Sequence, residues 1–279
     1  MFRRSFCIAG VTVQIVSDRE LEITEEALPF LCDAAEAAET TVYLHAVDAL
    51  PKLPDNGIWD SGRCFIGDTV YLCNGKAHPP YATVSYLENR DICIDYLPQS
   101  GAAVWKTSAL ISSLGLERML LDYDALILHA SFVTWKHSGI LFTAPSGTGK
   151  STQAELWRKY AGADILNGDR ACIRKTAEGY RAYGIPYAGS SYIYRNESAP
   201  IKAIVVLRQA KDNRVRRMEK GECLSRLLPE FSMHRWNAAF MNRALDRIAD
   251  ILELVPVYQL ECLPNADAVA VLQAALYER

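Results

Sequence analysis

The residues from Ala144 to Thr152 are the part of this sequence best suited to carry chemistry. The segment consists of Ala144, Pro145, Ser146, Gly147, Thr148, Gly149, Lys150, Ser151 and Thr152. Apart from its first position it matches G-x-x-x-x-G-K-[ST], a loop in which small residues let backbone N–H groups point at phosphate oxygens. The N-terminus of the following helix adds a partial positive charge. The segment therefore predicts a phosphate-binding loop.

Two side chains of this loop have separate expected roles. Lys150 is expected to contact the β- and γ-phosphates of a nucleotide, and Ser151 to place its hydroxyl on Mg²⁺. Position 144 is Ala where the pattern has Gly, the smallest departure available. The competing interpretation is a Gly- and Ser-rich turn that happens to precede a lysine. An apolar strand before the loop and helix-forming residues from Gln153 to Tyr160 favour the phosphate site.

A carboxylate is expected to return to the loop at Asp169. A helix from about Gly149 to Tyr160 would lead roughly 18 Å away from the loop at about 1.5 Å per residue. A strand from Ala163 to Gly168 would return about 20 Å at about 3.3 Å per residue. Asp169 would then follow the second strand of a βαβ unit, where it could bind Mg²⁺ or accept a proton from an attacking hydroxyl. The alternative is a surface turn in which Asp169 pairs with Arg170.

One histidine is also a candidate for the site. A hairpin centred between His137 and Ser138 would place His129 opposite Ser146, within a residue or two. An imidazole beside the loop could orient an acceptor or stabilise the charge of a transferred phosphate. The alternative is a structural histidine within an apolar strand.

The overall composition predicts an ordinary globular protein. The 279 residues are 50% hydrophobic and 23% charged, with a net charge of −3, and this length suggests one large or two modest domains. The pI of 6.0 gives no global positive field for nucleic acid or an anionic membrane. No uncharged run approaches the roughly 18 apolar residues that span a bilayer. We expect neither nucleic acid nor membrane as a partner, and homo-oligomerisation is compatible with the sequence.

The cysteines and histidines lack the spacing of common metal or disulfide motifs. The eight cysteines contain no C-x-x-C pair, and the five histidines no H-E-x-x-H. This pattern favours free thiols in a reducing compartment and hence a cytoplasmic location. It also predicts that any metal binds to oxygen ligands rather than to a zinc-type Cys/His cluster.

The elements around the loop suggest two domains. Residues 1–105 predict a smaller, β-rich α+β N-terminal domain of unassigned role, with one helix from Glu25 to Glu39. Residues 106–279 predict an α/β domain that carries the loop, with helices from Thr107 to Leu121 and from Met233 to Leu254. Short N-terminal strands are predicted over 6–16, 21–23, 42–44, 64–66, 70–73, 82–87 and 92–96.

Four motifs in this order resemble the catalytic domain of HPr kinase/phosphorylase and its relatives. They are His129-Ala130-Ser131, Leu141 to Thr152, Leu166 to Arg170, and Tyr183 to Gly189. The resemblance covers about residues 122 to 279. It implies a mixed-sheet P-loop kinase domain like the nucleotide-binding part of phosphoenolpyruvate carboxykinase. It also implies ATP and Mg²⁺, with phosphoryl transfer to a hydroxyl, such as free serine or a serine of a peptide or protein.

By position, the resemblance assigns His129, Lys150, Ser151 and Asp169 to the site, with Ser151 and Asp169 as metal ligands. The family commonly has two adjacent acids where this sequence has Gly168-Asp169, so one carboxylate is missing. The leading hypothesis is a kinase with a hydroxyl acceptor. The alternatives are a regulatory module that binds nucleotide without transferring phosphate, and a nucleotide-dependent carboxykinase, for which no Lys/His pair for a transition metal is evident.

Overall fold

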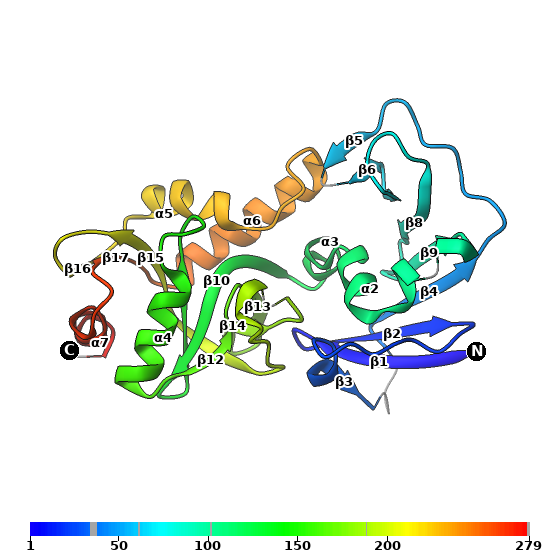
Figure 1. Ribbon diagram of the computed structural model, residues 1–279. Helices are drawn as coiled ribbons and strands as arrows, with labels where there is room; N and C mark the ends of the chain where they lie inside the picture. Colours follow the sequence, from blue (N-terminus) through cyan, green and yellow to red (C-terminus); the bar gives the residue numbers. More distant parts are fainter. Residues whose placement is uncertain (34–37, 61, 101, 188, 278–279) are drawn as a thin grey trace. The chain divides into compact units, whose positions relative to one another are not determined.

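The computed structural model describes residues 1–33, 38–60, 62–100, 102–187 and 189–277, and it divides into two units, Met1–Met119 and Leu120–Arg279 (Figure 1). The sequence predicted a division between residues 105 and 106. The structure keeps Thr107 in the first unit because its N–H donates to the carbonyl of Glu22 and its hydroxyl accepts from the N–H of Thr24.

The first unit is built on a nine-stranded mixed sheet of order β3-β1-β2-β4-β9-β8-β7-β6-β5. Its strands are β1 (Phe2–Ile8), β2 (Val11–Ser17), β3 (Leu31–Cys32), β4 (Thr40–Ala46), β5 (Ile58–Asp60), β6 (Arg63–Ile66), β7 (Thr69–Cys73), β8 (Pro80–Tyr86) and β9 (Ile92–Tyr96). Its short helices are η1 (Leu28–Phe30), η2 (Pro98–Ser100), α1 (Ala102–Trp105) and α2 (Thr107–Ser113). In the central strands, side chains alternate between a buried face, with Leu44 and Ile94, and a more exposed one, with His45 and Asp95.

Several predicted N-terminal elements differ from the structure. Residues 21–23, predicted as a strand, form only an isolated bridge, from Glu22 to Lys106. The strand predicted over 6–16 is two strands, β1 and β2, joined at Ala9-Gly10. The helix predicted from Glu25 to Glu39 is wrong over its described residues, which form only η1 and β3; Pro29 lacks an N–H and fits only a first helical turn, while residues 34–37 lie outside the described part. The helix predicted from Thr107 to Leu121 is split into α2 and α3 (Leu116–Leu121) by Gly115, whose φ is +57°.

The second unit contains an eight-stranded mixed sheet in which two long strands change partners. Its strands are β10 (Ala125–Trp135), β11 (Ser138–Thr143), β12 (Asp164–Asn167), β13 (Arg170–Thr176), β14 (Gly179–Gly184), β15 (Ser198–Gln209), β16 (Arg214–Arg217) and β17 (Val257–Cys262). The first half of β10 pairs with β13, and its second half pairs with β11 and β12. Likewise β15 pairs first with β14 and then with β11 and β17. The strands β10, β13, β14, β15 and β11 therefore form a closed ring.

The helices of the second unit pack against its sheet and form two separate hydrophobic cores. They are α4 (Lys150–Ala161), α5 (Lys220–Leu227), α6 (Ala238–Leu254) and α7 (Ala266–Tyr277), with the 3-10 turns η3 (Gly189–Ser191) and η4 (Leu228–Glu230). Alternate residues of β11 enter different cores: Phe142 packs with Trp157 of α4, whereas Leu141 belongs to the core of Phe240 in α6. The predicted helix from Met233 ends at Leu254 as expected but begins at Ala238, because the Asn237 side chain accepts from the N–H of Phe240.

The mixed α/β fold expected from the sequence is confirmed in this general form, since both sheets contain parallel and antiparallel pairs. Over the described residues, no helix combines the length and apolar character needed to cross a membrane.

Gly184, at the end of β14, is a position where any side chain should destabilise the protein. A Cβ at this residue would lie 2.0 Å from the carbonyl oxygen of Arg195, which is backbone and cannot rotate away. We expect Gly184→Ala to lower the free energy of unfolding by about 1–3 kcal/mol, as measured by urea denaturation. The control is Gly221→Ala in α5, where a Cβ meets nothing within 4 Å and should be neutral or stabilising. Equal stabilities of the two variants would contradict this prediction.

Candidate functional site

The predicted phosphate loop joins β11 to α4, and its backbone has positive φ angles at two positions, both of which are glycines. Gly147 has φ +78° and Gly149, the residue before the helix, has φ +121°. These left-handed values are disfavoured for residues with a Cβ. The Ala144 methyl lies in the core that contains Phe142 and Trp157, so the departure from glycine at this position is accommodated by packing. The loop therefore leads directly into the amino end of a twelve-residue helix.

Lys150 is the first residue of α4 and is only 7% exposed. Its Nζ donates a hydrogen bond of 2.8 Å to the carbonyl oxygen of Ala144, at the start of the loop. Burial lowers the pKa of Lys150, whereas the charges of Glu230 and Asp169 act to raise the pKa. The ammonium group is thus held against the loop, with two carboxylates near enough to influence its charge. Ser151 and Thr152 are exposed.

The chain returns to the loop as the sequence arithmetic predicts. Both β11 and β12 pair antiparallel with β10, so they run parallel to each other with β10 between them. The helix α4 connects them, and Asp169 follows two residues after the end of β12. The hairpin of β10 and β11 pairs Trp135 with Ser138 and Ala130 with Thr143. His129 therefore lies next to the start of the loop, within two residues of the predicted register.

His129 lies between two carboxylates. Its Nε2 is 3.5 Å from Oδ1 of Asp169, and its Nδ1 is 3.1 Å from Oε2 of Glu230. The Glu230 side chain is 10% exposed, against 30% for His129 and 32% for Asp169. Glu230 reaches this position because Leu128 and Phe231 form an antiparallel bridge, so η4 runs past β10. Glu230 could not be paired with His129 from the sequence, because the two residues are 101 positions apart.

The turn that carries Asp169 is fixed by a buried asparagine. The Oδ1 atom of Asn167 accepts hydrogen bonds from the backbone N–H groups of Asp169 and Arg170 at 3.0 and 2.9 Å. Its Nδ2 donates to the carbonyl oxygens of Ile185 and Tyr187 at 2.9 and 2.8 Å. One side chain thus ties the turn to the segment after β14. Most of the predicted Tyr183–Gly189 motif lies here, although Ala188 is outside the described residues.

The environment of Asp169 keeps its carboxylate ionised. The hydrogen-bonding contact with His129 is the main cause that lowers its pKa below the ordinary value of 3.8; burial opposes this effect, and the charges of Arg170, His129 and Lys150 add to it. Arg170 Nε is 3.4 Å from Oδ2 of Asp169. The expected alternative, pairing between Asp169 and Arg170, is therefore present together with the contact to His129.

There is no room for a second acid at position 168. A Cβ on Gly168 would lie 2.1 Å from Oγ and 2.4 Å from Cβ of Ser191. The carbonyl oxygen of Gly168 also accepts a hydrogen bond of 2.8 Å from the hydroxyl of Ser131 on β10. A larger residue would therefore require both η3 and this turn to move. The second carboxylate beside His129 comes instead from Glu230.

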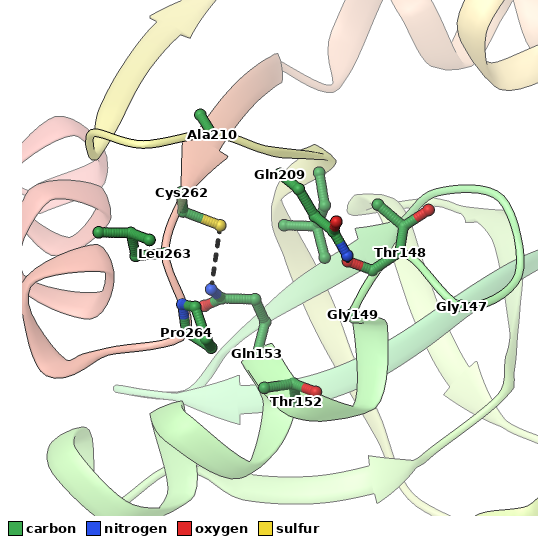
Figure 2. A pocket seen from close by; sticks show the side chains of 11 residues that line it. Gly147, Thr148, Gly149, Thr152, Gln153, Gln209, Ala210, Cys262, Leu263 and Pro264 are labelled. Carbon is green, nitrogen blue, oxygen red and sulfur yellow. Dashed lines mark hydrogen bonds between the residues drawn. The ribbon is translucent and has the colours of Figure 1, made fainter.

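Two pockets border the loop. Figure 2 shows the first, of about 460 Å³, which lies between loop residues Gly147 to Gly149 and the segment Cys262 to Pro264. In it, Nε2 of Gln153 donates to Sγ of Cys262 at 3.2 Å. The second pocket, of about 680 Å³, is more polar and is lined by Pro145 to Thr148 together with Arg208 and Arg226, among others. Neither lining includes His129, Lys150 or Asp169.

Two arginines of the second unit are already paired with carboxylates. Arg208 pairs with Glu261 at 2.9 Å, and Arg216 pairs with Glu222. Arg226, in α5, was not identified from the sequence, yet it lines the second pocket together with Ser146. The site as a whole can offer backbone amides, one ammonium group and an ionised carboxylate to an anionic ligand, with an imidazole between two acids beside it.

Fold and site together define an α/β protein with two mixed sheets, in which a glycine loop and a buried lysine follow β11. Beside them lies a carboxylate–histidine–carboxylate cluster, with Asp169 after β12, His129 within β10 and Glu230 in η4. The chain belongs to the family of the SynChlorMet cassette protein ScmC, whose model matches residues 109–263 and hence more than half of the sequence. The matched region contains the loop, His129, Asp169 and Glu230.

Comparison with other proteins gives only a distant structural similarity. No curated protein matches this chain at a significant level. Among solved structures, that of the Hpr(Ser) kinase/phosphatase from Coxiella burnetii is similar over 53% of this chain and 95% of its own, with 10% sequence identity and a TM-score of 0.32. The family that is shown is therefore that of ScmC and not the HPr kinase family that the motifs resemble.

Proposed function

We propose that this protein is an ATP- and Mg²⁺-dependent kinase of the P-loop type that transfers the γ-phosphoryl group to a hydroxyl, such as that of free serine or of a serine in a peptide or protein. The observation that carries the proposal is the meeting of Lys150, Asp169 and His129 beside a glycine loop. Phosphoryl transfer depends mainly on positioning and charge neutralisation, which these groups can supply.

The loop residues fit a nucleotide phosphate. Lys150 Nζ now donates to the Ala144 carbonyl, and in the complex it would exchange this bond for one to a β- or γ-phosphate oxygen. Backbone amides from Gly147 to Lys150 would donate to the remaining phosphate oxygens. The adjoining 460 Å³ pocket has apolar residues, Leu207 and Leu263 among them, and a pocket of this size and lining suits a purine base.

The side chains also fit Mg²⁺, which prefers oxygen ligands. Ser151 offers an exposed hydroxyl and Asp169 an ionised carboxylate. When bound, Mg²⁺ would neutralise part of the phosphate charge. The carboxylate cluster supports one further assignment: His129, held by Glu230, would orient Asp169 and face the transferred group. When both ring nitrogens carry a proton, the imidazole can donate to both carboxylates.

The proposed reaction is a direct displacement. A bond forms between the acceptor oxygen and the γ-phosphorus, and the bond from that phosphorus to the bridging oxygen of ADP breaks. The hydroxyl proton passes to Asp169 and then to solvent. Lys150 and the loop amides stabilise the charge that spreads over the transferred oxygens.

The test is incubation with γ-labelled ATP and Mg²⁺, with and without free serine or serine-containing peptides. We expect label to appear in an acceptor and only when an acceptor is present. Binding of nucleotide without turnover for every acceptor would favour the regulatory module, and dependence on Mn²⁺ and oxaloacetate would favour a carboxykinase. Absence of nucleotide binding would contradict all three functions.

The regulatory module is favoured by one observation, the lack of space for a second acid at Gly168. Without a carboxylate at position 168, an enzyme would have fewer groups to bind the metal and to accept the proton of the acceptor hydroxyl. Glu230 argues for the kinase, because it supplies a second carboxylate from a different element, 3.1 Å from the imidazole. The same acceptor assay separates the two functions.

Glu230 is expected to act as a positioning residue for His129. Glu230→Gln keeps the shape of the side chain but weakens its interaction with Nδ1 of His129. Turnover should therefore fall by roughly tenfold, which corresponds to about 1.4 kcal/mol in activation free energy, with little change in nucleotide affinity. The pH profile of turnover should shift as well, which a purely structural role would not cause. The control is Glu253→Gln, an exposed carboxylate of α6 that pairs with Lys220. Unchanged turnover and pH profile in Glu230→Gln would remove this residue from the site.

A further inference from the structure

The exposed face of the first unit's sheet brings together a histidine, a cysteine and an aspartate. The strands β4 and β9 are neighbours and run parallel, with His45 opposite Asp95 and Tyr43 opposite Cys93. Residues two apart on a strand share a face, so Cys93 and Asp95 lie on the same side as His45. The opposite side carries buried residues such as Leu44. The three polar side chains therefore lie together on the face away from the core.

The three donor atoms have the spacing of a metal site. Sγ of Cys93 is 3.3 Å from Nδ1 of His45 and 3.5 Å from Oδ1 of Asp95, and the latter two atoms are 3.4 Å apart. Tetrahedral zinc has bonds of about 2.3 Å to sulfur and about 2.0–2.2 Å to nitrogen and oxygen, which places pairs of ligand atoms about 3.4–3.6 Å from each other. The observed triangle is thus close to one face of a zinc tetrahedron.

The chemistry of the donors selects the same kind of ion. A thiolate together with an imidazole and one carboxylate suits a borderline-soft divalent ion such as Zn²⁺ and not Mg²⁺ or Ca²⁺, which prefer oxygen alone. The side chains of His45 and Asp95 are 51% and 38% exposed, so an ion has access from solvent. The backbone that carries these three residues is held in place, because β4 and β9 lie in the middle of the nine-stranded sheet and each pairs with a strand on both sides.

We propose that His45, Cys93 and Asp95 form a Zn²⁺ site in the first unit, with the fourth position open to water or another ligand. In the described part of the chain, this is the one group of three such residues whose donor atoms all lie within 4.8 Å. The sequence predicted metals only on oxygen ligands, because it contains no Cys/His metal motif; His45 and Cys93 are 48 residues apart. The proposal does not rest on the kinase function.

The test is a Co²⁺ titration of the full-length protein after chelator treatment, without nucleotide. We expect one equivalent of Co²⁺ to produce a thiolate-to-cobalt charge-transfer band and the strong visible absorption of a four-coordinate ion, and Zn²⁺ to displace it. Cys93→Ser should remove the charge-transfer band. His45→Ala and Asp95→Asn should weaken Zn²⁺ affinity by at least about tenfold. Zn²⁺ should also raise the melting temperature of the wild type and not that of Cys93→Ser.

Matched controls separate this site from the other seven thiols. Cys7→Ser changes a half-buried free cysteine of β1, and His78→Ala changes an exposed histidine; both should bind as the wild type does. If Cys93→Ser folds poorly by circular dichroism, the half-exposed His45→Ala variant tests the same site through its loss of Zn²⁺ affinity, and wild-type affinity in that variant would contradict the proposal. Absence of a charge-transfer band in the wild type, or a band that survives in Cys93→Ser, would overturn the proposal.

Discussion

Replacing Lys150 by alanine should reduce phosphoryl transfer by roughly 10²–10³-fold and weaken the binding of ATP. Lys150 is 7% exposed and its Nζ lies 2.8 Å from the Ala144 carbonyl oxygen, so its ammonium group is held at the start of the loop. Its removal leaves the phosphates without the ammonium group that is held against the loop, next to the negative charges of Glu230 and Asp169. Transfer from labelled ATP measures the first effect, and titration with a fluorescent nucleotide the second.

The control is Lys159→Ala, on the same helix but exposed, where Nζ lies 4.9 Å from the ring centre of Tyr160. This variant should retain both binding and transfer. A Lys150→Ala protein that folds and keeps wild-type transfer would refute the phosphate-loop assignment, and equal losses in both variants would point to a general effect of helix charge.

Asp169→Asn should reduce turnover by about 10²–10⁴-fold and change nucleotide affinity far less. The amide has nearly the same shape and preserves the turn held by Asn167, but it cannot accept the acceptor's proton and is a weaker ligand for Mg²⁺. Single-turnover transfer and nucleotide binding, measured on the same preparation, separate the two effects. Equal losses in turnover and affinity would argue against a role in proton transfer.

Asp164→Asn provides the control, since Asp164 at the start of β12 is 70% exposed and pairs only at 3.7 Å with Arg195. The pH profile gives a second test. Because the pKa of Asp169 is lowered below 3.8, its ionised form stabilises the native protein above the pKa of the unfolded chain. That contribution is lost as the pH falls through the folded pKa. Turnover should therefore not decline near about pH 5 through this group, and an acid limb there that disappears in Asp169→Asn would contradict the lowered pKa of Asp169.

Much of the loop region could be predicted from sequence because its constraints are local. An apolar run, three small residues and a lysine determine the order strand, loop and helix, and the observed β11 and α4 begin and end within about two residues of the prediction. The return of Asp169 followed from the lengths of α4 and the next strand alone. The hairpin register was displaced by two positions because the turn is centred on Lys136 and His137, both with positive φ.

The rest of the site depends on contacts between distant segments. Glu230 lies beside His129 only because Leu128 bridges to Phe231, and nothing in the local pattern around residue 230 indicates this pairing. Asn167 was noted as part of a motif, but two of its four hydrogen bonds require the segment after β14 to come near. The cluster of His45, Cys93 and Asp95 likewise results from the pairing of β4 with β9. Strand order is a property of the whole sheet, and one sequence does not specify it.

The change of partners along β10 and β15 has a mechanical consequence. A strand at the margin of an open sheet can detach by breaking a single ladder, whereas each member of a closed ring is held on both sides. His129 lies on β10 at the residue where pairing passes from β13 to β11, so local opening at that point would have to disrupt two ladders together. Backbone amides of β10 should consequently exchange with deuterium only through global unfolding, while those of the outermost strand β16 should exchange through fraying.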